Sequence, residues 1–301
     1  MIMANVITLD NEINMKFIKP IVGISKVVEN VDNVICGFNG VLSKGNNINA
    51  DALKALTECA KAGKEVVVLS NSYMRVNDLA ELIKQGDAEL LNYVKSIISA
   101  GEVLHYLLKN PKTLGLVGKK YYNIGLKTAD TVFAGLDYQE VSEISKADFI
   151  YMGAVKAETD TVEMYTSELE YASSLGLDFL CVGNDTATYM EGEVCLASGS
   201  VAEQYALLGG RVITFGKPDS KLAYYAKESF SNKTGKVLFI GDSFTTDMKT
   251  AKILDADMVL ISKGIHVNFL GEGYIPDVEK TRNLAQDYEV YPDYVMSGLR
   301  W

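Results

Sequence analysis

Two carboxylates five residues apart give the strongest chemical signal in this sequence. Asp242 and Asp247 belong to the segment Gly241-Asp242-Ser243-Phe244-Thr245-Thr246-Asp247, which directly follows the apolar run Val237–Ile240. A hard cation such as Mg²⁺ is bound by one or two carboxylates together with waters and phosphate oxygens. Asp242 could instead cap a following helix, but a cap accounts for one carboxylate and not for the pair. The spacing therefore favours a loop that handles a metal or a phosphate.

Two further polar residues come at the ends of short apolar runs. Lys217 follows Phe215-Gly216, where a fixed ammonium group could pair with a phosphate. Ser70 ends the run Glu65–Leu69 and begins what we predict to be a helix, whose first backbone N–H groups could bind an anion. A serine at this position also serves as a helix N-cap, and one residue can do both.

Short, continuously apolar runs must position these residues. Such runs are typical of strands buried on both faces, and a helix predicted over 50–63 lies between the first two of them. Strands that alternate with helices form a parallel sheet, and ligands bind beyond the carboxyl ends of its strands. We therefore predict an α/β fold with its site at that edge. The runs are Asn33–Gly37, Glu65–Ser70, Lys236–Asp242 and Met258–Ser262.

The middle of the chain repeats this pattern with other strands. We predict a smaller α/β unit over 103–196, inserted between the two halves of a larger unit, 20–102 and 197–301. Its expected strands and helix are Thr113–Gly118, Phe149–Gly153, Phe179–Gly183 and Thr161–Leu175.

These motifs, in this order, resemble the haloacid dehalogenase (HAD) superfamily. They are most similar to its phosphatases with a large α/β cap, the nitrophenylphosphatase and pyridoxal-phosphatase-like branch. The resemblance runs from about Val31 to Ser262 and implies a Rossmann-like parallel-sheet core with an inserted α/β cap. The motifs are Gly40-Val41-Leu42 with Gly45, Ser70-Asn71, Lys217, and Asp242 with Asp247.

The resemblance also implies roles for single residues. Ser70 and Lys217 would take part in catalysis, and Asn71 would contact the substrate. Asp185 would do so from the cap, because 181–185 resembles a cap segment that carries Asn-Pro-Asp in relatives. Mg²⁺ would be held by Asp242, Asp247 and the backbone carbonyl of Asn39, and the substrate would be a small phosphorylated metabolite.

The first motif departs from the family pattern Asp-x-Asp-Gly-Val/Thr-Leu. Gly37 stands where relatives carry the nucleophile that becomes an aspartyl phosphate, and Asn39 stands at the position of the general acid and base. Glycine has no side chain that could attack phosphorus or bind a metal. Asp32 lies roughly 16 Å upstream along the strand, and Cys36 points to the opposite face of the sheet. Direct activation of water by Asp242 or Asp247 remains an alternative.

We therefore expect a phosphatase-family pseudoenzyme that is inactive or weakly active, with Mg²⁺ bound weakly. The missing charge at Gly37 should reduce repulsion of a phosphate, so binding without turnover is expected. One alternative is a non-catalytic scaffold or regulator that binds a protein partner through its cap and acidic surface. Another is an active phosphatase with a different nucleophile, which the register fixed by Gly40-Val41-Leu42 disfavours.

The amino-acid composition limits the kinds of partner and the compartment that we expect for this protein. The formal net charge of −10 disfavours nucleic acid and anionic membranes as partners. The four cysteines show no framework spacing, and the first twenty residues lack the apolar run of a signal peptide, so we expect a cytoplasmic protein. The tail 271–301 is expected to be irregular, and either to pack over the core or to form a homo-oligomer contact.

Overall fold

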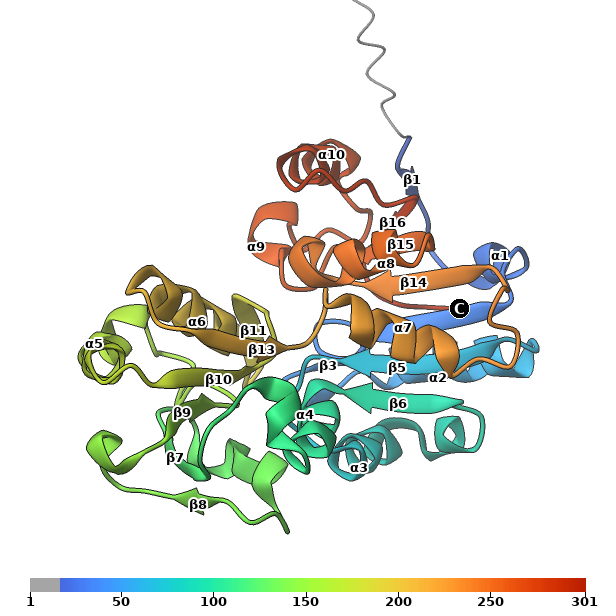
Figure 1. Cartoon of the computed structure of the whole chain (residues 1–301). Helices are drawn as coiled ribbons and strands as arrows, with labels where there is room; N and C mark the ends of the chain where they lie inside the picture. The colour runs from blue at the N-terminus through green and yellow to red at the C-terminus, as the bar shows by residue number, and fades with distance from the viewer. Residues whose placement is uncertain (1–16) are drawn as a thin grey trace, which may run out of the picture.

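The computed structural model describes residues 17–301 and divides into two α/β units (Figure 1). The core unit comprises residues 17–99 and 216–301, and the cap unit comprises residues 100–215. Residues 1–16, where we expected no signal peptide, lie outside the described residues. Within 17–301 no helix is long and apolar enough to cross a membrane.

A seven-stranded, fully parallel sheet forms the core unit, as the apolar runs predicted. Its central strands β14, β2 and β5 are buried almost throughout, which explains their continuous hydrophobicity. In spatial order the strands are β1 (Lys19–Pro20), β16 (Tyr294–Met296), β15 (Asp257–Ile261), β14 (Val237–Gly241), β2 (Asn33–Gly37), β5 (Glu65–Ser70) and β6 (Ser96–Ser99).

Helices cover both faces of this sheet. One face packs against α1 (Ser25–Val28), α2 (Ala50–Lys61) and α3 (Val76–Asp87). The other packs against α7 (Ser220–Glu228), α8 (Lys249–Ile253), α9 (Val267–Leu270) and α10 (Val278–Asp287). The α2 helix ends where predicted, because Gly63 follows it with a positive φ of 82°.

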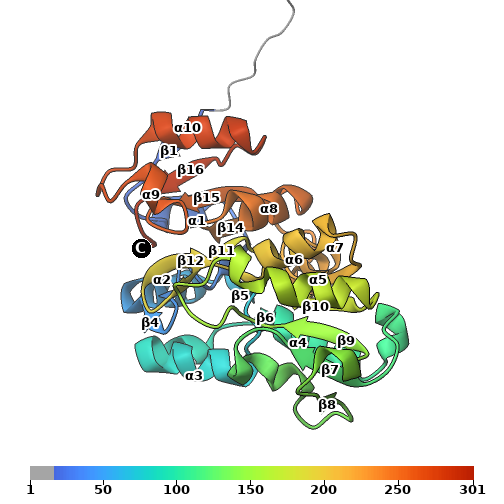
Figure 2. The ribbon, with the colours of Figure 1, turned by 90° about the vertical axis from the view of Figure 1, so that its left-hand side faces the viewer.

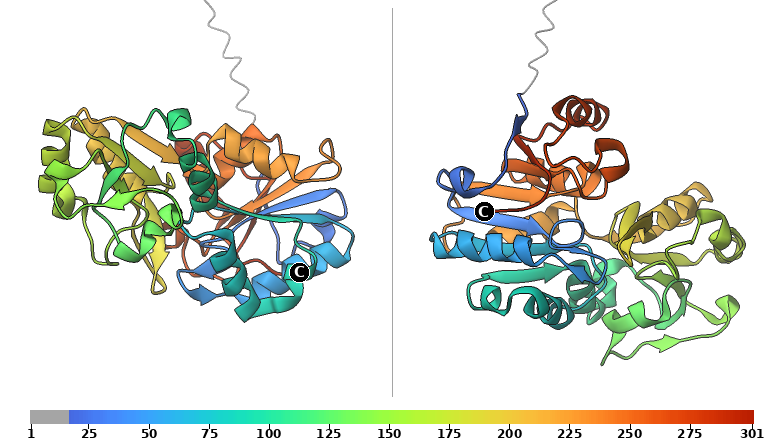
Figure 3. Two further views of the ribbon diagram at one scale, coloured as in Figure 1. Left: turned by 60° about the horizontal axis from the view of Figure 1, so that its bottom comes forward. Right: turned by 180° about the vertical axis from the view of Figure 1, so that it is seen from behind.

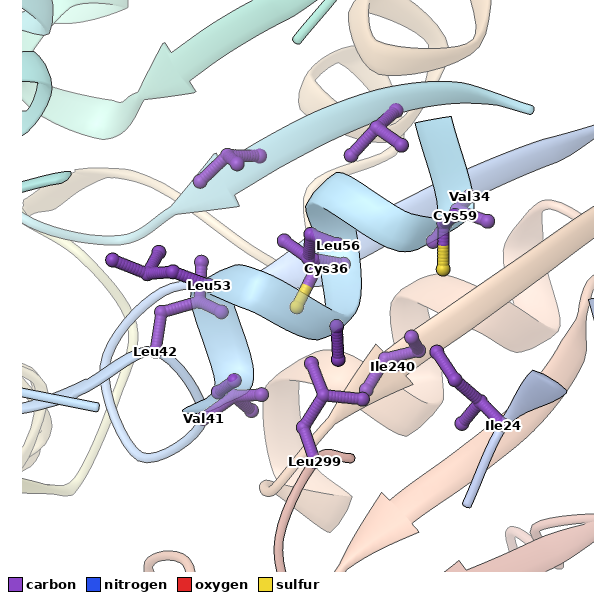
Figure 4. Packing of buried hydrophobic residues seen from close by; sticks show 14 of the residues in the cluster. Ile24, Val34, Cys36, Val41, Leu42, Leu53, Leu56, Cys59, Ile240 and Leu299 are labelled. Atoms are coloured by element: carbon purple, nitrogen blue, oxygen red, sulfur yellow. The ribbon is translucent and has the colours of Figure 1, made fainter. Parts of the chain in front are cut away.

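Strand alternation decides which residues of β2 can reach the site. Cys36 is fully buried in the cluster on the α2 face, among Leu42, Leu53 and Leu56 (Figure 4). Ile35 belongs to the cluster on the opposite face. The predicted orientation of Cys36, into the core and away from the phosphate loop, is confirmed.

The cap unit is built on a five-stranded parallel sheet. Its spatial order is β13 (Val212–Phe215), β10 (Asp178–Val182), β9 (Phe149–Met152), β7 (Lys120–Asn123) and β8 (Gln139–Glu140). The helices α4 (Ala100–Leu108), α5 (Thr166–Ser174) and α6 (Ser198–Leu207) pack on it. A hairpin of β11 (Ala187–Met190) and β12 (Glu193–Leu196) extends from it. The remaining elements are the hairpin β3 (Ser43–Lys44) and β4 (Asn47–Ile48), and short helical turns at 88–92, 111–114, 127–133, 144–146, 162–165 and 244–248.

Three expectations are corrected here. The predicted strand over 113–118 is a turn and a loop, because Gly115 and Gly118 both adopt positive φ angles, and the strand is β7 instead. The cap sheet runs past the predicted boundary at 197, because β13 pairs with β10. The tail 271–301 is not irregular: α10 packs on the core and β16 joins its sheet, so the tail packs over the core.

Candidate active site

The carboxyl ends of the core strands face the cap unit, and the predicted motifs meet there. Strands β5, β6 and β14 point toward the cap unit in Figure 1, and the β11–β12 hairpin of the cap lies near the core strands in Figure 2. The core unit and the cap unit lie side by side in Figure 3, and a cavity of about 440 Å³ lies between them. Six predicted site residues line this cavity: Asn39, Asn71, Asp185, Lys217, Asp242 and Asp247. Gly37 and Ser70 are not part of its lining.

A buried ion pair joins the third and fourth motifs. The Nζ atom of Lys217 lies 2.6 Å from Oδ1 of Asp247 and 3.3 Å from the carbonyl oxygen of Leu69. The Oδ2 atom of Asp247 accepts the backbone N–H groups of Asp242 and Ser243, at 3.0 and 3.3 Å. Burial opposes the charge on Lys217, but the surrounding carboxylates, led by Asp247, raise its pKa. Both oxygens of Asp247 are therefore occupied within the protein.

Gly37 lies directly against this pair. A Cβ atom at position 37 would lie 3.3 Å from each carboxylate oxygen of Asp247. A side chain here would thus start in close contact with the carboxylate of Asp247, at the position where the resemblance implies the nucleophile. Cys36 cannot replace it, because its thiol lies in the core and burial raises the pKa of that thiol well above its ordinary value.

Asp242 occupies a niche formed by two glycines. A Cβ atom at Gly40 would lie 1.8 Å from Oδ2 of Asp242, and one at Gly264 would lie 2.1 Å from its Cβ atom. Its carboxylate accepts the N–H of Ile265 at 2.7 Å. Burial and the nearby Asp247 raise the pKa of Asp242 well above its ordinary value. The helix-cap alternative is excluded, because Ser243 caps the following turn by accepting from the N–H of Thr246.

The second motif does not begin the helix that we expected there. The Ser70 hydroxyl accepts the N–H of Ser72 at 3.1 Å, and α3 begins only at Val76, so Ser70 does not start a helix. The Asn71 side chain accepts the N–H of Lys217 at 2.6 Å and donates to the carbonyl of Lys217 at 3.2 Å. Asn71 therefore positions Lys217, and its amide is already engaged.

The cap reaches the core through residues that the sequence analysis missed. Thr188 accepts a hydrogen bond from Nδ2 of Asn39 at 2.6 Å, and the Tyr189 hydroxyl donates to the carbonyl of Gly264 at 2.7 Å. Asp185, which the sequence analysis did name, accepts the hydroxyl of Thr246 at 2.8 Å. The sequence offered one signal for this hairpin, the glycine of the two-residue turn Glu191-Gly192. In the structure both turn residues have the positive φ angles, 49° and 91°, that are typical of a tight β-hairpin.

The donors available to Mg²⁺ fall short of the set that the resemblance implies. Asp247 is engaged by Lys217 and two N–H groups, and Gly37 offers no side-chain oxygen. Asp242 and the backbone carbonyl of Asn39 remain. Within residues 17–301 no three acidic, histidine or cysteine side chains gather into a metal site. One free carboxylate and one backbone carbonyl leave most of the coordination of an ion to water or to a bound ligand, so these residues fit weak binding and not a tightly held ion.

Comparisons with known proteins agree with this architecture. A family model described as haloacid dehalogenase-like hydrolase matches residues 34–139, and one described as HAD-hydrolase-like matches residues 214–300. Together they span more than half of the chain, which therefore belongs to the haloacid dehalogenase superfamily. A search of curated proteins gives no match.

Solved structures share this fold. A haloacid dehalogenase-like hydrolase from Brucella suis 1330 has a TM-score of 0.74 at 20% identity, covering 92% of this chain and 98% of its own. A possible sugar phosphatase from Cytophaga hutchinsonii has a TM-score of 0.71 at 17% identity, covering 94% and 98%. The 4-nitrophenylphosphatase of Thermotoga maritima has a TM-score of 0.62 at 18% identity, covering 90% and 96%.

Proposed function

We propose that this chain is a capped HAD pseudoenzyme, which binds a small molecule between core and cap and does not hydrolyse phosphate esters at a useful rate. The observation that carries this proposal is Gly37. It lies where a Cβ atom would face Asp247 at 3.3 Å, but it has no group that can attack phosphorus. Without a nucleophile no covalent intermediate forms, and the division of one difficult step into two easier ones is lost.

Weak hydrolysis of a phosphate ester could still occur in one way, through Asp242. The carboxylate of Asp242 lines the cavity and accepts a single hydrogen bond from the described residues, so it could activate a water beside a bound phosphate. Phosphate monoesters are among the slowest substrates to hydrolyse without catalysis. Loss of a nucleophile from a coupled site lowers the rate by as much as ~10⁶-fold. Activity by this route should be very weak.

The ligand that the family implies is a small phosphorylated metabolite, and the cavity of about 440 Å³ has room for one. Lys217 would then contribute its ammonium group. The superfamily generally uses Mg²⁺, and here we expect the ion to bind weakly through Asp242 and the carbonyl of Asn39. When bound, Mg²⁺ would offset the charge of the phosphate.

A reducing compartment, the cytoplasm, is part of the proposal. The four cysteines, Cys36, Cys59, Cys181 and Cys195, are all free and buried. Burial raises the pKa of both Cys59 and Cys181 to about 12, which makes these thiols poor nucleophiles.

The test measures binding and turnover in one sample. The full chain is mixed with each member of a phosphomonoester panel and Mg²⁺, binding is followed by calorimetry, and released phosphate is assayed afterwards. We expect binding of at least one ester and no phosphate release above a protein-free blank. Sustained multiple turnover by the natural chain would overturn the proposal.

A further inference from the structure

Two hairpins meet at the cleft, one from each unit. The core hairpin, residues 43–48, carries β3 and β4, and the cap hairpin, residues 187–196, carries β11 and β12. Gly45 of the core hairpin and Glu191 of the cap hairpin both line the cavity. A Cβ atom at Gly45 would lie only 3.1 Å from the backbone nitrogen of Glu191. The two hairpins therefore approach each other closely at this glycine.

The side chain of Asn39 joins the two hairpins with both ends of its amide. Its Oδ1 atom accepts the backbone N–H of Gly45 at 3.1 Å, which orients the amide, and its Nδ2 atom donates to Oγ1 of Thr188 at 2.6 Å. Asn39 stands where the resemblance places the general acid and base. In this chain the side chain at that position is engaged in binding the cap.

Tyr189 adds two contacts beside Thr188. Its hydroxyl donates to the carbonyl oxygen of Gly264 in the core at 2.7 Å. The Nζ atom of Lys44, in the core hairpin, lies 4.8 Å from the centre of its ring, a distance at which an ammonium group is attracted by an aromatic face. The cap hairpin is thus bonded to two separate loops of the core.

The apolar side chains of the cap hairpin pack on the cap itself. Met190 and Leu196 lie against the hydrophobic cluster formed by the cap sheet and its helices. Among the described residues, neither cluster of the core sheet includes a member of 187–196. Polar contacts, rather than a shared apolar cluster, therefore join the cap hairpin to the core unit.

The cap is attached differently where the chain passes between the two units. Arg75 of the core donates two hydrogen bonds to the carboxylate of Glu102 on α4, at 2.6 and 2.8 Å. Asn184 donates to the carbonyl of Gly216 at 3.1 Å, and Tyr73 packs against an apolar cluster of the cap. A lobe anchored on one side and held by a few polar contacts on the other can open as a hinge.

We propose that the contacts of Asn39 and Lys44 with Thr188 and Tyr189 form a latch, which keeps the cap closed and regulates how fast a ligand enters and leaves the cleft. This inference rests on the proposed function only in treating the cleft as the ligand site. Loss of one hydrogen bond shifts an equilibrium between closed and open forms roughly fivefold. Asn39 is a positioning residue in this account, since it acts on the ligand site through the cap hairpin.

The first test measures access to the cleft with a thiol placed inside it. Ala154→Cys puts a thiol on the cap side of the lining, and the four natural cysteines are buried, so the reagent dithionitrobenzoate reports on position 154. Adding Thr188→Val removes the acceptor of Asn39 and should speed labelling at least about fivefold. Adding Thr113→Val instead, at an exposed threonine of the cap outside the lining, should leave the rate unchanged. Equal rates with and without Thr188→Val would overturn the proposal.

A second test needs no added cysteine. Amides of 43–48 and 187–192 should exchange with solvent faster in Asn39→Ala and in Thr188→Val. The double variant should change little beyond Asn39→Ala, because both substitutions remove the same bond. Amides of β14, inside the core sheet, should exchange as in the natural chain, which separates opening of the latch from general destabilisation.

Effects of the two substitutions that simply add, or faster exchange that spreads to β14, would refute the latch. Neither test uses a ligand or follows turnover. The proposed loss of hydrolysis therefore stands or falls separately.

Discussion

The ammonium group of Lys217 lies 2.6 Å from the carboxylate of Asp247, and both side chains are almost completely buried, at 6% and 1% exposure. The two residues come from different segments, the loop after β13 and the turn after β14. Their pairing joins the third and fourth motifs beside Gly37, which supplies no carboxylate.

Breaking this pair should destabilise the chain strongly. Lys217→Met leaves the buried Asp247 carboxylate without its cation, and loss of one partner of a buried pair lowers the free energy of unfolding by about 3–5 kcal/mol. Urea unfolding measures the effect. The matched control is Lys233→Met, whose lysine pairs with Glu228 on the surface, and we expect a change below about 1 kcal/mol. Similar losses in the two variants would contradict the assigned role of the pair.

The niche around Asp242 should not tolerate a larger residue at Gly40. Gly40 has a φ of 86°, and a Cβ atom there would lie 1.8 Å from the carboxylate of Asp242. Gly63 has a similar φ of 82° but open space around it. Gly63→Ala should lose about 1–2 kcal/mol from left-handed backbone strain alone, and Gly40→Ala should lose clearly more. Equal melting temperatures of the two variants would show that Asp242 moves aside freely.

Acid should weaken the fold through His266. Its Nε2 atom accepts the N–H of Phe244 at 3.2 Å, and burial lowers the pKa of His266 to about 4. The unfolded chain binds a proton at this histidine below about pH 6.5, whereas the folded chain does so only near pH 4. The contribution of His266 to stability is therefore fully present above about pH 6.5 and falls as the pH drops toward 4, by up to about 3 kcal/mol.

Urea unfolding of the natural chain and of His266→Gln between pH 7 and 4.5 measures this contribution. The glutamine oxygen can still accept from Phe244 but does not titrate in this range. The stability of the variant should fall less steeply on acidification. Parallel pH curves for the two proteins would assign the acid sensitivity to other groups.

The cap hairpin should loosen when its contact with the core is removed. Tyr189→Phe deletes the hydroxyl that donates to the carbonyl of Gly264, a bond expected to contribute about 1 kcal/mol. Hydrogen exchange of the amides in 187–196 should become faster, while the core strands stay unchanged. Tyr171→Phe, on the exposed part of α5, serves as control and should leave the hairpin unaffected. Unchanged exchange in Tyr189→Phe would mean that other contacts hold the hairpin closed.

The sequence predicted the core of this fold better than its cap. Strands such as Asn33–Gly37 are buried on both faces, so their composition alone reveals them, and polar residues at their ends converge because the strands are parallel. The sequence analysis did not predict that β13 belongs to the cap sheet, because the apolar character of a strand does not tell which sheet it joins. Thr188 and Tyr189 were also missed, since their importance comes from contacts across the cleft with Asn39 and Gly264, far away in the chain.

The most direct measurement of the central claim is phosphate release by three forms of the full chain with Mg²⁺ on a phosphomonoester panel. The natural chain should be inactive, and Gly37→Asp with Asn39→Asp should hydrolyse at least one ester on the order of 10²-fold faster or more. The control, Gly37→Asn with Asn39→Asp, differs from that variant by a single side-chain group and should stay inactive. Hydrolysis by the natural chain at the rate of the restored variant would contradict the claim that Gly37 marks the loss of catalysis.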